Sequence, residues 1–309
     1  MPFPTLALNS GYEIPQIGFG TGTKFRGTDV GGIVSDALAA GFTHLDAAEV
    51  YRNEDTVGRV IASVDRSKIF VTSKFFLGDV AHNCANSVQK LGVGYLDLYL
   101  VHMPRSIASN FADGWKQFEA LKRKGLARSI GVSNFTLEQL KTVVESAQIK
   151  PAVNQIRLHL YCYQEQKPIL DYCAEHNILV QAYNVLTPIT QDAGGPLDTP
   201  LRAAADARGC TPAQVIFLWL LAKHVVILTS SSKRERMDEY LATANFAPLT
   251  DIEIRQLEEA GEKGPSKNLD ETMCSTCAGY NCTYCAKIAS VSADAKANDA
   301  ATRQVLATM

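Results

Sequence analysis

The sequence predicts an α/β protein folded as a (β/α)8 barrel, also called a TIM barrel. Short apolar, β-prone runs alternate along the chain with longer amphipathic runs, as expected when helical crossovers join the strands of a parallel sheet. Eight strand-like runs occur, and eight strand–helix units are the number that closes such a barrel. Ionisable residues follow several of these runs, at the carboxyl ends where barrels of this class hold their active sites.

The expected elements begin with an N-terminal β-hairpin, with strands at 5–8 and 12–14 around a turn that contains Gly11. Barrel strands are expected at 17–20, 42–46, 69–73, 96–101, 128–132, 152–156, 178–183 and 225–228. Helices are expected at 29–40, 54–63, 80–91, 112–124, 136–147, 164–177, 212–223, 233–244 and 251–262. Gly41, which follows the first helical run, is a typical helix stop.

The end of the alternating pattern predicts where the barrel stops. Gly264 and Pro265 terminate the last helical run, so we predict a barrel over 1–264 and a Cys-rich C-terminal extension over 265–309 that is partly disordered. Before that, the segment 184–199 is rich in Pro, Gly, Thr and Asp and carries no clear periodicity. Connections of this length in a compact domain are usually functional lids or lack order.

A dinucleotide-binding domain with a glycine fingerprint is the structural alternative. The one candidate is the run from Gly18 to Thr23, in which the third glycine falls one residue early and no helical pattern opens directly afterwards. We therefore reject that fold. The glycines are better explained by a tight turn or by close approach of the backbone to a ligand.

Composition narrows the class of function. The 309 residues are 46% hydrophobic and 20% charged, with a formal net charge of -2, which is ordinary for a globular protein and predicts no nucleic-acid or membrane partner. The N-terminus has no basic, apolar leader, and no apolar run reaches about 18 residues. We expect a cytoplasmic monomer or weak dimer whose partner is a small molecule.

Four polar residues at the ends of three successive strands carry the predicted chemistry: Asp46, Tyr51, Lys74 and His102, which we call the tetrad. Parallel strands bring these ends to one face of the barrel. A carbonyl under reduction gains negative charge on oxygen and needs a proton, which a tyrosine can supply. An adjacent ammonium lowers the pKa of a phenol, a carboxylate holds the ammonium, and an imidazole orients the carbonyl.

Each member of the tetrad has a plain structural alternative. Asp46 is also compatible with a helix cap, Lys74 with a solvated surface residue and His102 with a satisfied core histidine. The coincidence of all four at one barrel face favours the functional interpretation.

The same residues resemble the signature of the aldo-keto reductases. The resemblance runs through Leu45-Asp46-Ala47-Ala48, Tyr51, Asn53-Glu54, Lys74, Val101-His102-Met103-Pro104, Gly131-Val132-Ser133-Asn134-Phe135 and Val153-Asn154-Gln155, and it covers roughly residues 5 to 262. It implies reduction of aldehydes or ketones to alcohols with a nicotinamide cofactor. It also implies that Tyr51 is the general acid, that Lys74 and Asp46 tune it, and that His102 orients the substrate.

The resemblance further implies a set of cofactor contacts. Ser133, Asn134 and Gln155 match residues that bind the nicotinamide carboxamide, and Tyr183 matches the aromatic residue that stacks on the ring. The remaining predicted cofactor contacts are Gly22, Thr23, Asn184, Ser230, Ser231 and Arg236. The alternatives are a core tyrosine at 183 and a turn or helix cap at 133–134.

Two departures from the family pattern concern specificity. Ser230 replaces the lysine that usually meets the 2′-phosphate of NADPH, whereas Arg236 matches the phosphate-facing arginine, so NADPH is the expected cofactor. The alternative for this segment is a helix start capped by serines. Gly22 and Met103 replace two pocket tryptophans, and Phe25 and Trp115 are candidates to restore the aromatic wall.

The segments Gly-Thr-Gly-Thr at 20–23 and Ser-Ser-Ser-Lys at 230–233 resemble the fungal ketone and conjugated polyketone reductase branch, which implies ketones, vicinal dicarbonyls or ketolactones as substrates rather than sugars. Phe25 and Met103 are the predicted substrate contacts.

The extension carries four crowded cysteines: Cys274, Cys277, Cys282 and Cys285. Their two CxxC pairs suit a zinc knuckle, but the four-residue connector is short, so we assign no metal site. The remaining possibilities are a redox-active tail or a disordered segment. The rival function is accordingly a nucleotide-binding regulatory module with a metal- or redox-sensing tail.

Overall fold

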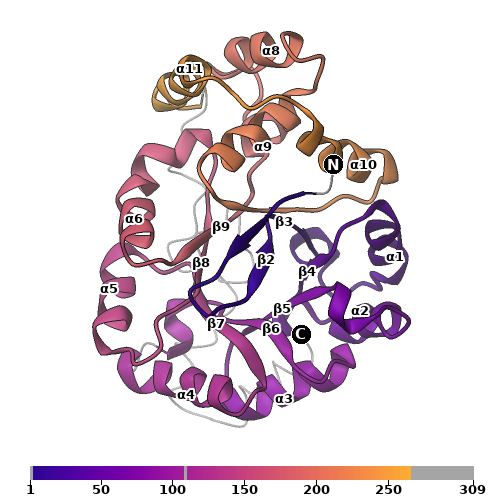
Figure 1. Cartoon of the computed structure of the whole chain (residues 1–309), viewed down its shortest axis with the longest axis vertical. Helices are drawn as coiled ribbons and strands as arrows, with labels where there is room; N and C mark the ends of the chain where they lie inside the picture. The colour runs from indigo at the N-terminus through magenta and orange to yellow at the C-terminus, as the bar shows by residue number, and fades with distance from the viewer. Residues whose placement is uncertain (1–2, 108–109, 266–309) are drawn as a thin grey trace, which may run out of the picture. The chain divides into compact units, whose positions relative to one another are not determined.

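A closed barrel of eight parallel strands forms the centre of the protein. The computed structural model describes residues 3–107 and 110–265. The strands are β3 (Ile17–Gly20), β4 (His44–Asp46), β5 (Phe70–Phe75), β6 (Leu96–Val101), β7 (Ala127–Ser133), β8 (Val153–Arg157), β9 (Leu179–Tyr183) and β10 (Val226–Thr229). They follow chain order around the barrel, and β10 closes it against β3 (Figure 1). The predicted fold class is confirmed.

Helices surround this barrel (Figure 1), and all nine predicted helices are present, together with α7 and α8, which were not predicted. They are α1 (Gly31–Ala40), α2 (Glu54–Ile61), α3 (Val80–Leu91), α4 (Phe111–Arg123), α5 (Leu137–Ser146), α6 (Tyr163–Glu175), α7 (Thr187–Thr190), α8 (Asp198–Asp206), α9 (Pro212–Ala222), α10 (Arg234–Ala242) and α11 (Asp251–Glu262). Single 3-10 turns are η1 (Thr23–Phe25), η2 (Glu49–Tyr51), η3 (Arg66–Lys68), η4 (Pro104–Ile107), η5 (Leu160–Cys162) and η6 (Thr243–Asn245).

The helix boundaries have local causes. Thr136, Thr211 and Thr250 each cap a helix through a reciprocal capping box, beginning α5, α9 and α11. The predicted stop at Gly41 is confirmed, since this residue ends α1 with a φ of 116°, in the left-handed region that suits glycine.

The segment 184–199 differs from the prediction, because α7 lies within it and α8 begins at its end. Neither helix has a side-chain N-cap, so the usual start signal is missing from the sequence. α8 is held instead by packing of Leu201, Ala204 and Ala205 against the neighbouring helices α9 and α11. This second layer also explains why α9 is apolar on all sides, since β10 lies on one side of it and α8 on another.

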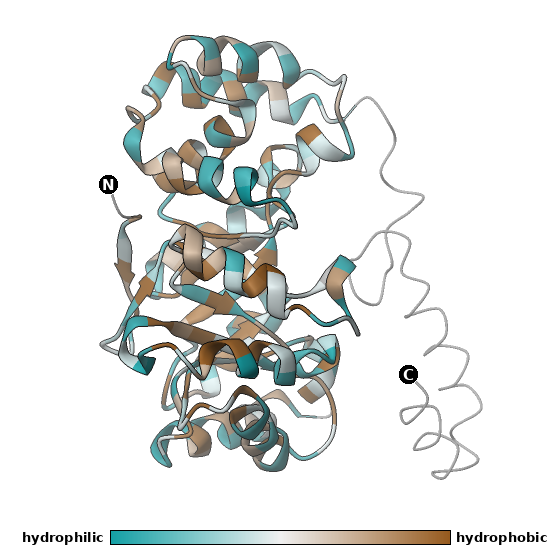
Figure 2. Ribbon diagram, turned by 90° about the vertical axis from the view of Figure 1, so that its right-hand side faces the viewer, coloured by the Kyte–Doolittle hydropathy of each residue, from teal (hydrophilic) through white to brown (hydrophobic). Residues whose placement is uncertain are grey.

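The N-terminal hairpin, β1 (Thr5–Ala7) and β2 (Glu13–Pro15), pairs antiparallel and packs onto one end of the barrel. Its Leu8 and Ile14 are buried with Phe70, Leu98 and further inward-facing strand residues. In Figure 2 the central strands are largely hydrophobic, whereas hydrophilic and hydrophobic residues alternate along the surrounding helices. The apolar plug fills the amino-terminal end of the barrel, so polar chemistry is left to the carboxyl-terminal end.

Within residues 3–107 and 110–265, no helix is long and apolar enough to cross a bilayer. In the same residues, Cys84, Cys162 and Cys173 are buried free thiols and Cys210 is half-buried. The four cysteines of the predicted extension lie outside the described residues.

Candidate active site

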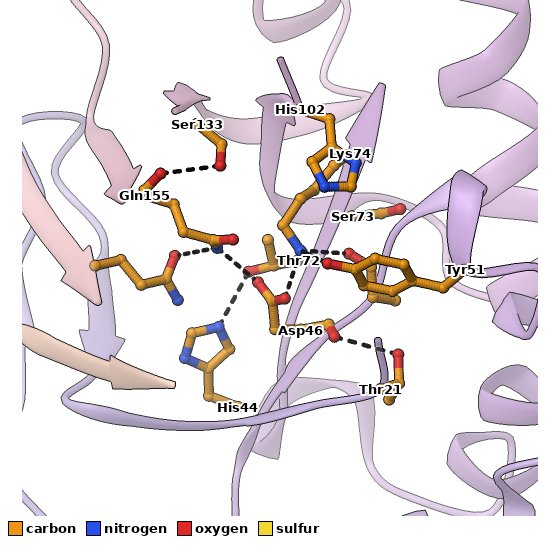
Figure 3. Close-up of polar contacts among 12 residues, drawn as sticks. Thr21, His44, Asp46, Tyr51, Thr72, Ser73, Lys74, His102, Ser133 and Gln155 are labelled. Carbon is orange, nitrogen blue, oxygen red and sulfur yellow. Dashed lines mark hydrogen bonds and ion pairs between the residues drawn. The ribbon is translucent and has the colours of Figure 1, made fainter. Parts of the chain in front are cut away.

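The tetrad assembles where three neighbouring strands end. Asp46 is the last residue of β4, Lys74 lies near the end of β5, and His102 directly follows β6. Strand register places Asp46 opposite Thr72, two residues before Lys74. Figure 3 shows Lys74 between Asp46 and the ring of Tyr51, with His102 beside them. The structure therefore brings together all four side chains that the sequence singles out.

Lys74 is fully buried and makes a hydrogen bond with each of its three ammonium protons. Its Nζ donates to Asp46 Oδ1, to the Ala47 carbonyl oxygen at 2.9 Å and to Tyr51 Oη at 3.4 Å. A buried ammonium is tolerable only when its charge and its donors are compensated in this way.

The protonation states follow from burial and from the neighbouring charges. Burial acts to lower the pKa of Lys74, but Asp46 and Tyr51 outweigh it and raise that pKa above its usual value, so the ammonium stays charged. Burial raises the pKa of Tyr51, and the Lys74 charge opposes this without cancelling it. Lys74 does act to lower the pKa of Tyr51, as the sequence predicts, but desolvation of the phenolate is the larger effect and the net direction is upwards.

His102 faces Tyr51 edge-on, with ring centroids 5.6 Å apart at an interplanar angle of 87°. Burial, followed by the positive charge of Lys74, holds the pKa of His102 well below its usual value. The imidazole is therefore neutral at physiological pH and has one N–H to donate to a substrate oxygen.

Gly22 lies against the ring of Tyr51 and explains its placement. A Cβ on Gly22 would come within 2.4 Å of Tyr51 Cζ, so any larger residue would displace the phenol. The backbone of Gly27 also donates to the Tyr51 carbonyl oxygen at 2.8 Å. The glycine predicted as a cofactor contact therefore determines where the Tyr51 ring can lie. Thr23, predicted with it, begins η1 directly afterwards.

Three further polar residues support the tetrad. Asn53 donates to the carbonyl oxygen of Thr21 at 2.8 Å, and Glu54 accepts from Ser73 at 2.6 Å. Sequence reasoning missed Glu49, which accepts from the backbone of Phe76 at 2.6 Å. This hydrogen bond holds η2 against the end of β5. The position of Glu49 two residues before Tyr51 is the sequence feature that could have identified it.

The predicted nicotinamide contacts form one patch beside His102. Asn134, at a φ of 64°, donates to the His102 carbonyl oxygen at 3.0 Å and accepts from Tyr183 Oη at 2.6 Å. Ser133 donates to the Gln155 carbonyl oxygen at 2.9 Å, as Figure 3 shows. Amide and hydroxyl groups beside a half-buried aromatic ring are the groups that a nicotinamide carboxamide needs.

A separate cavity of about 410 Å³ lies between the α7–α8 segment, the start of α9 and α10. Arg236 and Tyr240 line it from α10, and Arg202 lines it from α8. Arg202 was missed, because only the packing of α8 turns this residue towards the cavity. Asp198 and Glu239 also line this cavity, and its two guanidinium groups are the groups that suit a phosphate.

The predicted serines behave differently from Arg236. Ser230 is exposed and does not line the cavity, whereas the buried Ser231 accepts from the Lys233 backbone at 3.0 Å. The serines do not cap α10, because its N-cap residue is Lys233 and the helix start has no side-chain cap hydrogen bond. Asn184 is exposed, adopts a φ of 56° and begins the segment that leads to α7.

Of the predicted pocket residues, Met103 lies beside the tetrad, whereas Trp115 does not restore the aromatic wall. Met103 is buried and accepts from Asn134 Nδ2 at 3.3 Å, next to the tetrad. Phe25 is half-buried, and its carbonyl oxygen accepts from Asn53. Trp115 was wrongly expected in the pocket: it stacks on Phe118 and donates to the Ile149 carbonyl oxygen, because α4 turns it towards the core.

Comparison with known protein families matches residues 16–262 to the Aldo/keto reductase family. The chain belongs to this family. Aldo/keto reductases are oxidoreductases that reduce small-molecule carbonyl compounds to alcohols with a nicotinamide cofactor, and this chain shares that general activity.

Several relatives are similar over most of their length. The NAD/NADP-dependent indole-3-acetaldehyde reductase of Schizosaccharomyces pombe is 37% identical over 273 residues, covering 82% of this chain and 93% of the relative. The D/L-glyceraldehyde reductase of Hypocrea jecorina is 35% identical, covering 87% and 91%. A crystal structure of an aldo/keto reductase from Brucella melitensis superposes with a TM-score of 0.75 at 29% identity, covering 84% of this chain and 99% of the other.

Proposed function

We propose that this aldo/keto reductase uses NADPH to reduce aldehydes or ketones, including vicinal dicarbonyls and ketolactones, with Tyr51 as the general acid. The observation that carries the proposal is the buried chain of hydrogen bonds from Asp46 through Lys74 to Tyr51, next to the neutral ring of His102. A fixed ammonium beside a protonated phenol is suited to giving a proton to an oxygen that becomes negative.

The cofactor supplies a hydride to the carbonyl carbon when it is bound. The carbonyl π bond breaks, its electron pair moves to oxygen, and Tyr51 Oη transfers its proton to that oxygen. Lys74 stabilises the phenolate that remains, and solvent returns the proton to Tyr51 afterwards. His102 donates its single N–H to the carbonyl oxygen, which polarises the bond and orients the substrate. In this account, Tyr51 can stay protonated despite its raised pKa, because the alkoxide that forms is a stronger base.

Support for NADPH comes from the cavity between α8 and α10. The 2′-phosphate distinguishes NADPH from NADH, and Arg202 and Arg236 offer two planar cations to it. We assign the remaining cofactor contacts to Ser133, Asn134, Gln155 and Tyr183. Both arginines are exposed, so water screens their charge and we expect a preference for NADPH over NADH rather than an absolute choice.

The test is consumption of NADPH by the full chain with a panel of aldehydes, α-diketones, ketolactones and sugars. We expect turnover with the first three classes and little with sugars. Binding of NADPH without turnover on any of them would favour the rival function, a nucleotide-binding regulatory module. Zinc and iron analysis of the purified protein tests whether the cysteine tail carries metal.

A further inference from the structure

A hydrogen-bonded row of side chains crosses the barrel interior and ends at the tetrad. Gln155 Nε2, on β8, donates to Asp46 Oδ2 at 2.9 Å and to Gln181 Oε1, on β9, at 2.9 Å. These three residues are at most 3% exposed. Figure 3 shows Gln155 reaching across the barrel to Asp46.

The partners of Gln155 determine which way its amide faces. A carboxylate only accepts hydrogen bonds, so Asp46 requires the NH2 side of this amide. The second amide hydrogen then meets Gln181 Oε1, and both donors are used. If the amide turned over, its oxygen would face two acceptor oxygens at once, which is repulsive. The side-chain oxygen of Gln155, Oε1, is thereby held on the side away from Asp46 and Gln181.

This arrangement leaves the side-chain NH2 group of Gln181 without a hydrogen bond within residues 3–107 and 110–265. Its Nε2 is buried and has no hydrogen-bond partner among the described residues. A buried amide donor without a partner destabilises a fold, and an apolar residue of similar size would not incur that loss. Stability therefore does not account for a glutamine here, whereas its accepting oxygen has a defined role towards Gln155.

We infer that Gln181 is a positioning residue, which locks the Gln155 amide so that its oxygen receives the cofactor carboxamide and its NH2 group holds Asp46. The inference rests on the proposed function, in which Gln155 binds the nicotinamide. Gln181 touches neither cofactor nor substrate in this account. Its effect passes through Gln155 to both the cofactor and the carboxylate that holds Lys74.

The test is a double-mutant cycle of Gln181→Met and Gln155→Met in the full chain. The readouts are the NADPH dissociation constant, kcat, and the share of hydride taken from each face of stereospecifically deuterated NADPH. Gln181→Met should weaken NADPH binding about tenfold, the equivalent of one net hydrogen bond, and should lower the face selectivity. In the Gln155→Met background it should change neither, because residues that act as one unit are not additive.

The matched control is Gln16→Met. Gln16 is as buried as Gln155 but donates to the Val225 carbonyl oxygen at the closed end of the barrel. It should leave NADPH affinity and face selectivity unchanged. Gln181→Asn, too short to reach Gln155, is the second variant if the methionine variant does not fold, and it should show the same loss.

Additive losses in the cycle, or equal losses in the Gln16→Met control, would overturn the inference and leave the proposed function standing. A wild-type chain that consumes no NADPH on any carbonyl would overturn the proposed function and this inference with it.

Discussion

The two halves of the proposed cofactor site are built in opposite ways. At the tetrad, Lys74 is fully buried, its charge is matched by the buried Asp46, and hydrogen bonds hold both groups. At the nucleotide cavity, Arg202 and Arg236 are exposed on two outer helices. Electrostatic effects are large where water is excluded and modest where it screens them. Changes at the tetrad should therefore cost far more than changes at the cavity.

The largest effect is expected from Tyr51→Phe, which removes the transferable proton and little shape. General acid catalysis typically contributes about a hundred- to ten-thousandfold, so kcat on a ketone should fall by that factor. The NADPH dissociation constant should stay within a few-fold of wild type. Steady-state turnover and cofactor fluorescence measure the two, and near-normal turnover would remove Tyr51 from the mechanism.

Lys74→Met comes next, because it leaves Asp46 buried without its partner. Breaking a buried pair typically costs about 3–5 kcal/mol, which denaturant unfolding should reveal. Turnover should also fall sharply, since the Tyr51 phenolate loses its stabilising charge. The exposed pair of Lys116 and Asp113 provides a control, and Lys116→Met should leave the free energy of unfolding almost unchanged. Comparable losses of stability in the two variants would contradict the argument that burial makes the pair of Lys74 and Asp46 the more important one.

The pH dependence of stability probes the same interior. Burial lowers the pKa of His44 to about 4. Its Nε2 forms a hydrogen bond with Thr72 Oγ1. Below pH 6.5 this imidazole is protonated in the unfolded chain, whereas in the folded chain it stays neutral down to about pH 4. The free energy of unfolding should therefore fall by roughly 3 kcal/mol as the pH drops from 6.5 to 4. His44→Gln should flatten this slope, whereas His82→Gln, at an exposed histidine, should not. Equal slopes in wild type and His44→Gln would exclude His44 as the source.

At the cavity the expected effects are smaller. Arg236→Ala should weaken NADPH by about tenfold and NADH hardly at all, since a charge-assisted hydrogen bond contributes about 1.5–3 kcal/mol and this one is exposed. Arg202→Ala should show the same selectivity to a lesser degree. Added salt should reduce both differences. Equal losses for the two cofactors would mean that neither arginine meets the 2′-phosphate.

The smallest effect on the barrel is expected from deletion of residues 266–309. The eight strand–helix units are complete by Glu262, so the truncated chain should fold and bind NADPH. Substrate preference is the property in which we expect any change. Circular dichroism, cofactor binding and the carbonyl panel measure these properties. If the truncated chain does not fold, the proposed boundary at residue 264 is wrong.

Much of the fold was predictable because its signals are local. The apolar runs gave each barrel strand to within a few residues, and the amphipathic runs gave α9 and α11, which begin after the capping boxes at Thr211 and Thr250. The short helices α7 and α8 were missed, because they have no side-chain caps and depend on packing. Trp115 was misplaced for a related reason, since chain order does not reveal which side of α4 faces the core.

The sequence alone determined the barrel and the membership of the tetrad. Parallel strands carry their end residues to one face, so Asp46, Lys74 and His102 had to meet there once the strands were recognised. Only the tertiary structure decided how these groups behave. Burial keeps the pKa of Tyr51 above its usual value despite Lys74, Gln181 reaches Gln155 across neighbouring strands, and α8 brings Arg202 to the cavity of Arg236. Desolvation and long-range contacts depend on the whole surrounding fold, and no local stretch of residues encodes them.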